Sequence, residues 1–151
     1  MIEGQESQAT AEGKVESLEK IDTSWNALLD VLNGIPADRL NDPVCGEWSV
    51  KDLVAHIAFW DGQAEIEAQR DALGESSPET DWQAMNEREA AASKDRPYDE
   101  VWRELNDTHE RMRSVFRQLP ALDVKSVGGD TFDHYDEHRA EIASWRERNG
   151  I

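Results

Sequence analysis

The chain has 151 residues, of which 33 are acidic and 16 are basic, and its net charge at pH 7 is −17. This length suits one domain with one hydrophobic core, and six tryptophans supply large apolar surfaces for that core. A strongly negative field repels phosphate backbones and anionic lipids, so we expect neither nucleic acid nor a membrane surface as a partner. The simplest alternative meaning of the charge is high solubility.

Cys45 is the one cysteine in the sequence, so no disulfide can form within the chain. The N-terminal sequence MIEGQESQATAEGK lacks the basic start and apolar middle of a signal peptide, and no apolar run approaches the ~20 residues of a membrane span. These features predict a soluble protein of the reducing cytoplasm. A role for Cys45 in thiol chemistry is the less favoured interpretation, because a lone cysteine is more often incidental.

Apolar residues recur at helical spacing along most of the chain, and strand patterns are nearly absent. Residues 1–10 are polar and predict a frayed tail. The first helix ends at the sequence NGIP, residues 33–36, because glycine and proline interrupt helices. The second begins at Ser49, which is predicted to form a capping box with Asp52, and ends at Gly74. The residues expected on the buried faces of these two helices are Leu18, Ile21, Trp25, Leu28, Leu32, Val50, Leu53, Ile57, Trp60 and Ala64.

A long polar connection, residues 74–97, follows the second helix and contains a short helix near 81–92. A connection of this length allows the second and third long helices to run parallel. The third extends over residues 98–119, and a loop then leads to a fourth helix capped by Asp130 or Thr131. The sequence therefore predicts an all-α fold, a four-helix bundle with a long crossover between helices 2 and 3.

Two of the four histidines, His134 and His138, are four residues apart at the start of the last helix. Side chains at this spacing lie on one helix face about 5–6 Å apart at Cβ, so both imidazoles could reach one metal ion at about 2.0–2.1 Å. His56 is the candidate third ligand, because its neighbours Leu53 and Trp60 belong to the buried face of the second helix. The spacing alone also fits structural histidines, and both interpretations stay open at this point.

The fourth histidine, His109, occupies a core position between Leu105 and Met112 on the third helix. A neutral imidazole hydrogen-bonded to a neighbour is the usual occupant of such a position, so we expect a core residue or a support for a metal ligand. Several acidic residues near the histidines could orient imidazoles or act as bases, although most are expected on solvated helix faces. These acidic residues are Asp52, Asp61, Asp133, Asp136 and Glu137.

The sequence GEWSVKDLVAHIAFWD, residues 46–61, together with HYDEH at 134–138, resembles the DinB-like superfamily of four-helix-bundle metalloenzymes. The resemblance covers residues 11–151 as a single domain. It implies a metal ion held by one histidine of the second helix and two of the last. The ligands that it implies are His56, His134 and His138. Relatives in this superfamily include maleylpyruvate isomerases that use mycothiol and transferases that attach low-molecular-weight thiols to electrophiles.

The resemblance implies a metal-dependent enzyme, a transferase or hydrolase, that acts on a small electrophilic molecule by thiol transfer or detoxification. Zn, Ni or Fe(II) suits imidazole ligands, and a low-molecular-weight thiol is the implied co-substrate. The alternative is a non-catalytic module for ligand binding, protection or protein interaction, with structural histidines in a closed, dry pocket. A homodimer is compatible with either interpretation.

The up-down-down-up helix order of this superfamily makes a specific demand on the site. Helices 2 and 4 are then antiparallel, yet His56 lies two turns after the start of helix 2 and His134 less than one turn after the start of helix 4. Strong tilting or unequal helix lengths are needed to bring the imidazoles level. We therefore expect a site in a cleft, and a separation far beyond ~5 Å between His56 Nε2 and the other two rings would exclude it.

Overall fold

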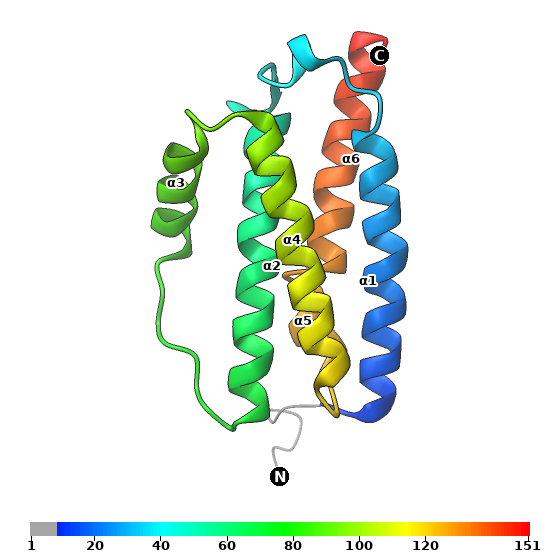
Figure 1. Ribbon diagram of the computed structural model, residues 1–151, viewed down its shortest axis with the longest axis vertical. Coiled ribbons are helices and arrows are strands. Elements are labelled where there is room, and N and C mark those ends of the chain that lie inside the picture. The colour runs from blue at the N-terminus through cyan, green and yellow to red at the C-terminus, as the bar shows by residue number, and fades with distance from the viewer. Residues whose placement is uncertain (1–8) are drawn as a thin grey trace.

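The computed structural model describes residues 9–151 and confirms the predicted four-helix bundle (Figure 1). The long helices within this range are α1 (Ala11–Leu32), α2 (Val50–Ala72), α4 (Tyr98–Gln118) and α6 (Phe132–Asn149). In Figure 1, α1 and α6 run upward and α2 and α4 run downward, so α2 and α4 are parallel, as the long crossover predicts. The closest packing joins α2 to α4 and α1 to α6.

The core is built from the apolar faces that the helical spacing predicts. Burial of these faces removes apolar surface from water at roughly 25 cal/mol per Å² and provides most of the stabilisation of the fold. Leu18 and Trp60 are the exceptions in the predicted set, because both are only half-buried, and Trp60 lies beside the candidate site. The fully buried aliphatic residues include Ile21, Leu28, Val50, Leu53, Ile57, Leu105 and Ile142.

The start of α2 is fixed by a capping box and a small hairpin. Ser49 Oγ accepts from Asp52 N at 3.1 Å, and Ser49 N donates to Asp52 Oδ2 at 3.0 Å, as predicted. The hairpin of β1 (Pro43–Cys45) and β2 (Trp48–Ser49) and the preceding 3₁₀ turn η2 (Ala37–Arg39) were not expected, because strands of two or three residues carry no alternating pattern. The hairpin places Cys45 and Trp48 at the N-terminal end of α2.

The crossover from α2 to α4 contains α3 (Trp82–Ser93), close to the predicted range of 81–92. α3 packs against α2 on the outside of the bundle (Figure 1), where Trp60 Nε1 donates to Asn86 Oδ1 at 3.0 Å. The end of the crossover is tied to the start of α2, because the buried Lys51 Nζ donates to the carbonyl oxygens of Lys94 and Arg96 at 2.7 and 2.9 Å. The crossover is therefore an ordered part of the fold.

A short helix, α5 (Val124–Gly128), precedes α6 where the sequence predicted only a loop. Gly128 allows the two helices to pack closely, because a Cβ at this position would lie 2.5 Å from Phe132 Cζ. Thr131 is the residue before α6, and its hydroxyl donates to Val127 O at 2.6 Å rather than capping the helix. α5 fills the space below the start of α6, so α6 begins partway up the bundle (Figure 1).

The start of α1 is hydrogen-bonded to the segment that follows α4. Of the tail predicted over residues 1–10, residues 1–8 lie outside the described residues. Thr10 pairs with Leu122 through two backbone hydrogen bonds of 3.1 Å, and its hydroxyl accepts from Gly13 N at 2.7 Å. Among the described residues, no helix has the length and apolar character needed to cross a membrane.

Candidate metal centre

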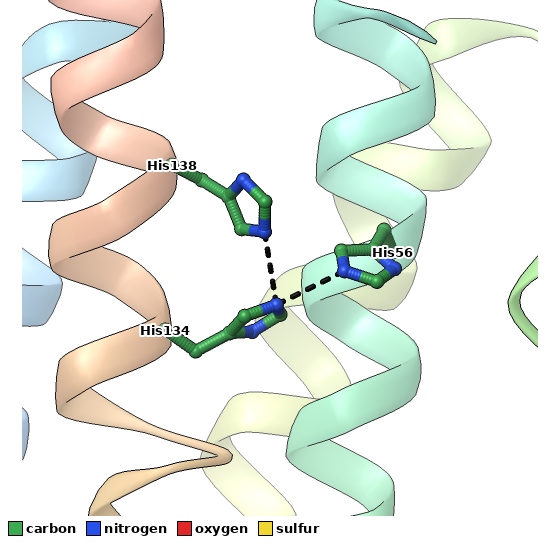
Figure 2. A group of neighbouring side chains, drawn as sticks. All are labelled: His56, His134 and His138. Atoms are coloured by element: carbon green, nitrogen blue, oxygen red, sulfur yellow. Dashed lines mark hydrogen bonds between the residues drawn. The ribbon is translucent and has the colours of Figure 1, made fainter. Parts of the chain in front are cut away.

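The structure brings His56 of α2 together with His134 and His138 of α6, and the three rings face one another across the gap between the helices (Figure 2). His134 Nε2 lies 3.0 Å from His56 Nε2 and 2.9 Å from His138 Nε2. One possible ligand nitrogen from each ring lies within 4.8 Å of the other two. The separation that would have excluded the three-histidine site is therefore not found.

The three rings are level because α2 and α6 are offset along the bundle. His56 is six residues after the first residue of α2, about 9 Å along its axis, whereas His134 is 15 residues before the end of α6, about 22 Å. The end of α6 accordingly rises above the start of α2 in Figure 1. This offset brings His56 level with His134 and His138 although α2 and α6 are antiparallel.

Burial keeps two of the rings neutral at physiological pH. Desolvation, followed by the charge of the neighbouring His138, lowers the pKa of His56 to about 4. Burial also lowers the pKa of His134 to about 3, with added repulsion from His138 and His56. Neutral imidazoles have a free lone pair, which is the form that binds a metal ion.

A carboxylate that the sequence analysis overlooked orients the third ring. Glu141 Oε1 lies 2.5 Å from His138 Nδ1, which leaves His138 Nε2 directed at the other histidines. The other oxygen, Glu141 Oε2, accepts from Cys45 Sγ at 3.1 Å. This bond to Glu141 and partial burial raise the pKa of Cys45, which disfavours a reactive thiolate. The i,i+3 spacing of His138 and Glu141 on one helix was the available sequence signal.

Two indoles flank the histidines. The Trp48 ring lies 4.7 Å from the His56 ring, centroid to centroid, and the Trp60 ring lies 6.4 Å from His56 and 6.2 Å from His134. His138 is buried, while His56 and His134 are half-buried. The rings are therefore partly shielded from water without being enclosed.

His109 lies in a separate, fully packed polar group. Its Nδ1 is 2.9 Å from Asp61 Oδ2 and 3.1 Å from the Tyr135 hydroxyl, which itself donates to Asp61 Oδ1. The Trp25 ring stacks on the imidazole with centroids 3.5 Å apart. Burial raises the pKa of Asp61 despite its hydrogen bonds, and burial beside Asp61 raises the pKa of Tyr135. His109 is thus a core histidine with its own partners, as its position on the third long helix predicted.

The five acidic residues singled out in the sequence divide by position. Asp52 caps α2, and Asp61 belongs to the His109 group. The other three, Asp133, Asp136 and Glu137, are exposed on α6, as expected for solvated helix faces. The carboxylate beside the metal-ligand candidates is instead Glu141, which shares a helix face with His138.

The arrangement is suited to hold a divalent cation. Three imidazole nitrogens converge, and cis ligands 2.0–2.1 Å from a common ion would be separated by about 2.9 Å in octahedral geometry and about 3.4 Å in tetrahedral geometry. Neutral rings at 2.9 and 3.0 Å fit such a donor set. His134 Nδ1 is also buried without a hydrogen-bond partner among the described residues. The three rings thus define a candidate metal centre.

Most of the chain matches a known protein family. Residues 21–132 match the mycothiol maleylpyruvate isomerase N-terminal domain family, and the chain belongs to this family. The match confirms the DinB-like resemblance inferred from the sequence. It includes His56 and ends two residues before His134, so the family match does not extend to the two α6 histidines that lie beside His56.

A crystal structure of an uncharacterised protein from Escherichia coli UTI89 has the same fold, with a TM-score of 0.76. The two chains are 20% identical, and the similarity covers 91% of this chain and 95% of that chain. Comparison with curated proteins gives no match. The structural likeness supports the bundle architecture across nearly the whole described chain.

Proposed function

We propose that His56, His134 and His138 bind a divalent metal ion, Zn, Ni or Fe(II), and that the protein is a metal-dependent enzyme acting on a small electrophilic molecule. The convergence of the three Nε2 atoms carries this proposal. Each neutral imidazole has one N–H and one lone pair, so a cation can replace the N–H···N contacts of 2.9 and 3.0 Å and accept one lone pair from each ring. A three-histidine site leaves coordination positions open for exogenous ligands.

The proposed reaction is transfer of a low-molecular-weight thiol, which the family's mycothiol-dependent relatives support. A divalent ion held by His56, His134 and His138 would lower the pKa of a thiol and so favour its thiolate near neutral pH. The thiol loses its proton to solvent, and its sulfur bonds the electrophilic carbon with the freed electron pair. The displaced group leaves with the pair of the bond that breaks.

The surrounding residues have defined parts in this proposal. Glu141 holds His138 in the orientation that directs Nε2 to the centre. Trp48 and Trp60 limit the access of water around His56 without closing the site. The closed pocket expected of a non-catalytic module is not the arrangement seen, since His56 and His134 are half-buried. The geometry therefore supports an enzyme better than a structural histidine cluster.

Metal analysis by mass spectrometry on untagged protein tests the metal centre. We expect about one equivalent of a divalent metal in the wild type, and its loss in His56→Ala and His138→Ala with retained helical circular dichroism. Conjugation of cysteine with 1-chloro-2,4-dinitrobenzene, followed by absorbance, then tests thiol transfer in metal-loaded and chelated protein. A wild type that binds no divalent metal at pH 7.5 would contradict the proposal.

A further inference from the structure

A cavity of about 880 Å³ lies beside the candidate metal centre without including its histidines. Its walls come from the C-terminal half of α2, the connection after it, the first residue of α3, and the segment from the end of α4 to the start of α6. The end of α2 and the segment after α4 lie at the end of the bundle that is lower in Figure 1, whereas α3 begins farther up beside α2. The volume is in the range of small-molecule sites, which are about 300–1,000 Å³.

The charged side chains among the described residues that line the cavity are all acidic. Neither lysine, arginine nor histidine is among the described residues that line it. Burial, with repulsion from Glu67 and Asp61, raises the pKa of the half-buried Asp130 carboxyl to about 6. Glu67 has partners, since it accepts from Arg70 and Ser77. The carboxylates that line the cavity are Glu67, Asp71, Glu75, Asp123 and Asp130.

Two indoles form an aromatic part of the same wall. The rings of Trp60 and Trp82 are 4.9 Å apart at their centroids and tilted by 47°. Trp60 is held in place by its hydrogen bond to Asn86, while Trp82 is 36% exposed. Indole faces attract cations and also pack against apolar groups. Ala64 and Ala68, one turn apart on α2, add a smooth apolar surface.

Trp60 connects this cavity to the histidines. Its ring lines the cavity and is also 6.2 Å from the His134 ring and 6.4 Å from the His56 ring. A molecule seated against the indoles would therefore lie next to the proposed metal centre. Carboxylates around its charged end would favour a cation and repel an anion of similar shape.

We propose that this cavity binds an organic cation, an amine or ammonium group carried on an apolar body, as the part of the electrophilic substrate that lies beside the neighbouring centre. The assignment as a substrate rests on the proposed function, whereas the binding of the cation does not require a metal. The carboxylates select the charge, and the indoles and alanines receive the apolar body. Anionic thiols and anionic electrophiles are disfavoured in this part of the site.

Three probes with one carbon skeleton test the charge preference: 3-phenylpropylamine, 3-phenylpropan-1-ol and 3-phenylpropionate. We expect titration calorimetry on chelated protein at pH 7 to give at least tenfold tighter binding of the amine than of the alcohol, and the weakest binding for the acid. Tryptophan fluorescence should change on binding of the amine. Equal binding of all three probes, or no binding of the amine, would overturn the proposal.

Two variants locate the binding in the cavity. Asp130→Asn and Trp82→Leu should each weaken binding of the amine about fivefold or more, because they remove a charge and an indole from the wall. Asp107→Asn is the matched control, since it removes one negative charge from an exposed position on α4 outside the cavity. An equal loss of affinity in the control would assign the effect to the overall charge of the protein and overturn the proposed site.

The same probes separate this proposal from the proposed metal centre. The His138→Ala variant should bind the amine as the wild type does, because His138 does not line the cavity. If the wild type contains no metal as purified and still binds the amine, the cation site is supported and the absence of metal counts against the metal-dependent function. A wild type that holds metal and fails to bind the amine would overturn the cation site alone.

Discussion

The two groups of histidines differ in what their ring nitrogens face. His109 points its Nδ1 at Asp61 and Tyr135 and is stacked on Trp25, so complementary groups surround it. His56 and His134 differ from His109, because their Nε2 atoms face another imidazole. The partners of His109 are a carboxylate and a hydroxyl, whereas those of His56 and His134 are other imidazoles that could bind a metal ion together.

One helix contributes to both groups through adjacent residues. His134 faces α2, and the next residue, Tyr135, is fully buried and bonded to Asp61. Successive side chains on a helix are about 100° apart, so neighbouring residues reach different surroundings. The fixed Tyr135 therefore sets the rotation of α6 that directs His134 and His138 at His56. The buried polar group is a positional support for the candidate centre.

Removal of a ring from the cluster is expected to have the largest effect. A four-ligand structural zinc site binds with about 10–16 kcal/mol, so the share of one ligand is about 3 kcal/mol, more than 100-fold in Kd. We expect the metal affinity of His138→Ala to fall by that factor in a competition titration with a chelator. His109→Gln is the control for the other histidine group and should retain about one equivalent. Equal losses in the two variants would remove the distinction between the groups.

Disruption of the buried group should act on folding instead. Asp61→Ala leaves the Tyr135 hydroxyl and His109 Nδ1 without their common acceptor, and we expect a loss of about 3 kcal/mol in the free energy of unfolding. Urea denaturation of the chelated protein measures this loss. The exposed Asp107→Ala should stay within about 0.5 kcal/mol of the wild type. An Asp61 variant as stable as the wild type would show that the group is not a structural support.

Acid should destabilise the metal-free protein through the cluster. The pKa values of His56 and His134 are lowered to about 4 and about 3 in the folded state, so the unfolded state binds more protons below pH 6.5. Stability is then lost as pH falls from about 6.5 toward 4, by about 3 kcal/mol if the coupled rings take up a single proton. Asp130 acts in the opposite direction, because its raised pKa of about 6 makes the folded carboxyl the better proton acceptor.

Chelated wild type and His134→Asn compared by urea denaturation at pH 7 and pH 4.5 check this sign. The variant removes the ring with the lower pKa, so its stability should fall less between the two pH values. A wild type that gains stability on acidification would mean that the carboxyls of Asp61 and Asp130, both with raised pKa values, outweigh the histidines. Asp130→Asn should then reduce that gain.

The fold could be predicted from the sequence wherever a long helix buries an apolar face. Ile21, Leu28, Leu53 and Ile57 were predicted in the core and have no exposed surface, because their 3,4 spacing leaves little choice of face. The five-residue α5 was not predicted, since it is too short for a periodic pattern. α5 lies below the start of α6, where α6 is offset along the bundle so that the three histidines are level.

The site was accessible only in part. The spacing of His134 and His138 pointed to one helix face, while the place of His56 came from its neighbours and from the family resemblance. The pairing of Asp61 with His109 depends on how α2, α4 and α6 are rotated against one another, and no local pattern encodes that rotation. Glu141 was missed although it is three residues from His138, because its tie to Cys45 arises only after the hairpin forms.

The smallest expected effect concerns the carboxylate that touches the cluster. Glu141→Gln keeps the size of the side chain and removes its charge, so His138 loses a charged acceptor at Nδ1 while keeping its position. We expect metal affinity to fall about tenfold, or about 1.4 kcal/mol, by chelator competition, since partners of ligating histidines contribute 10–100-fold. Cys45→Ser is the control, because the hydroxyl can still donate to Glu141. An unchanged metal affinity in Glu141→Gln would mean that the α6 backbone alone orients His138. His109 would then have a carboxylate partner that matters, Asp61, while the three-histidine cluster would not depend on one.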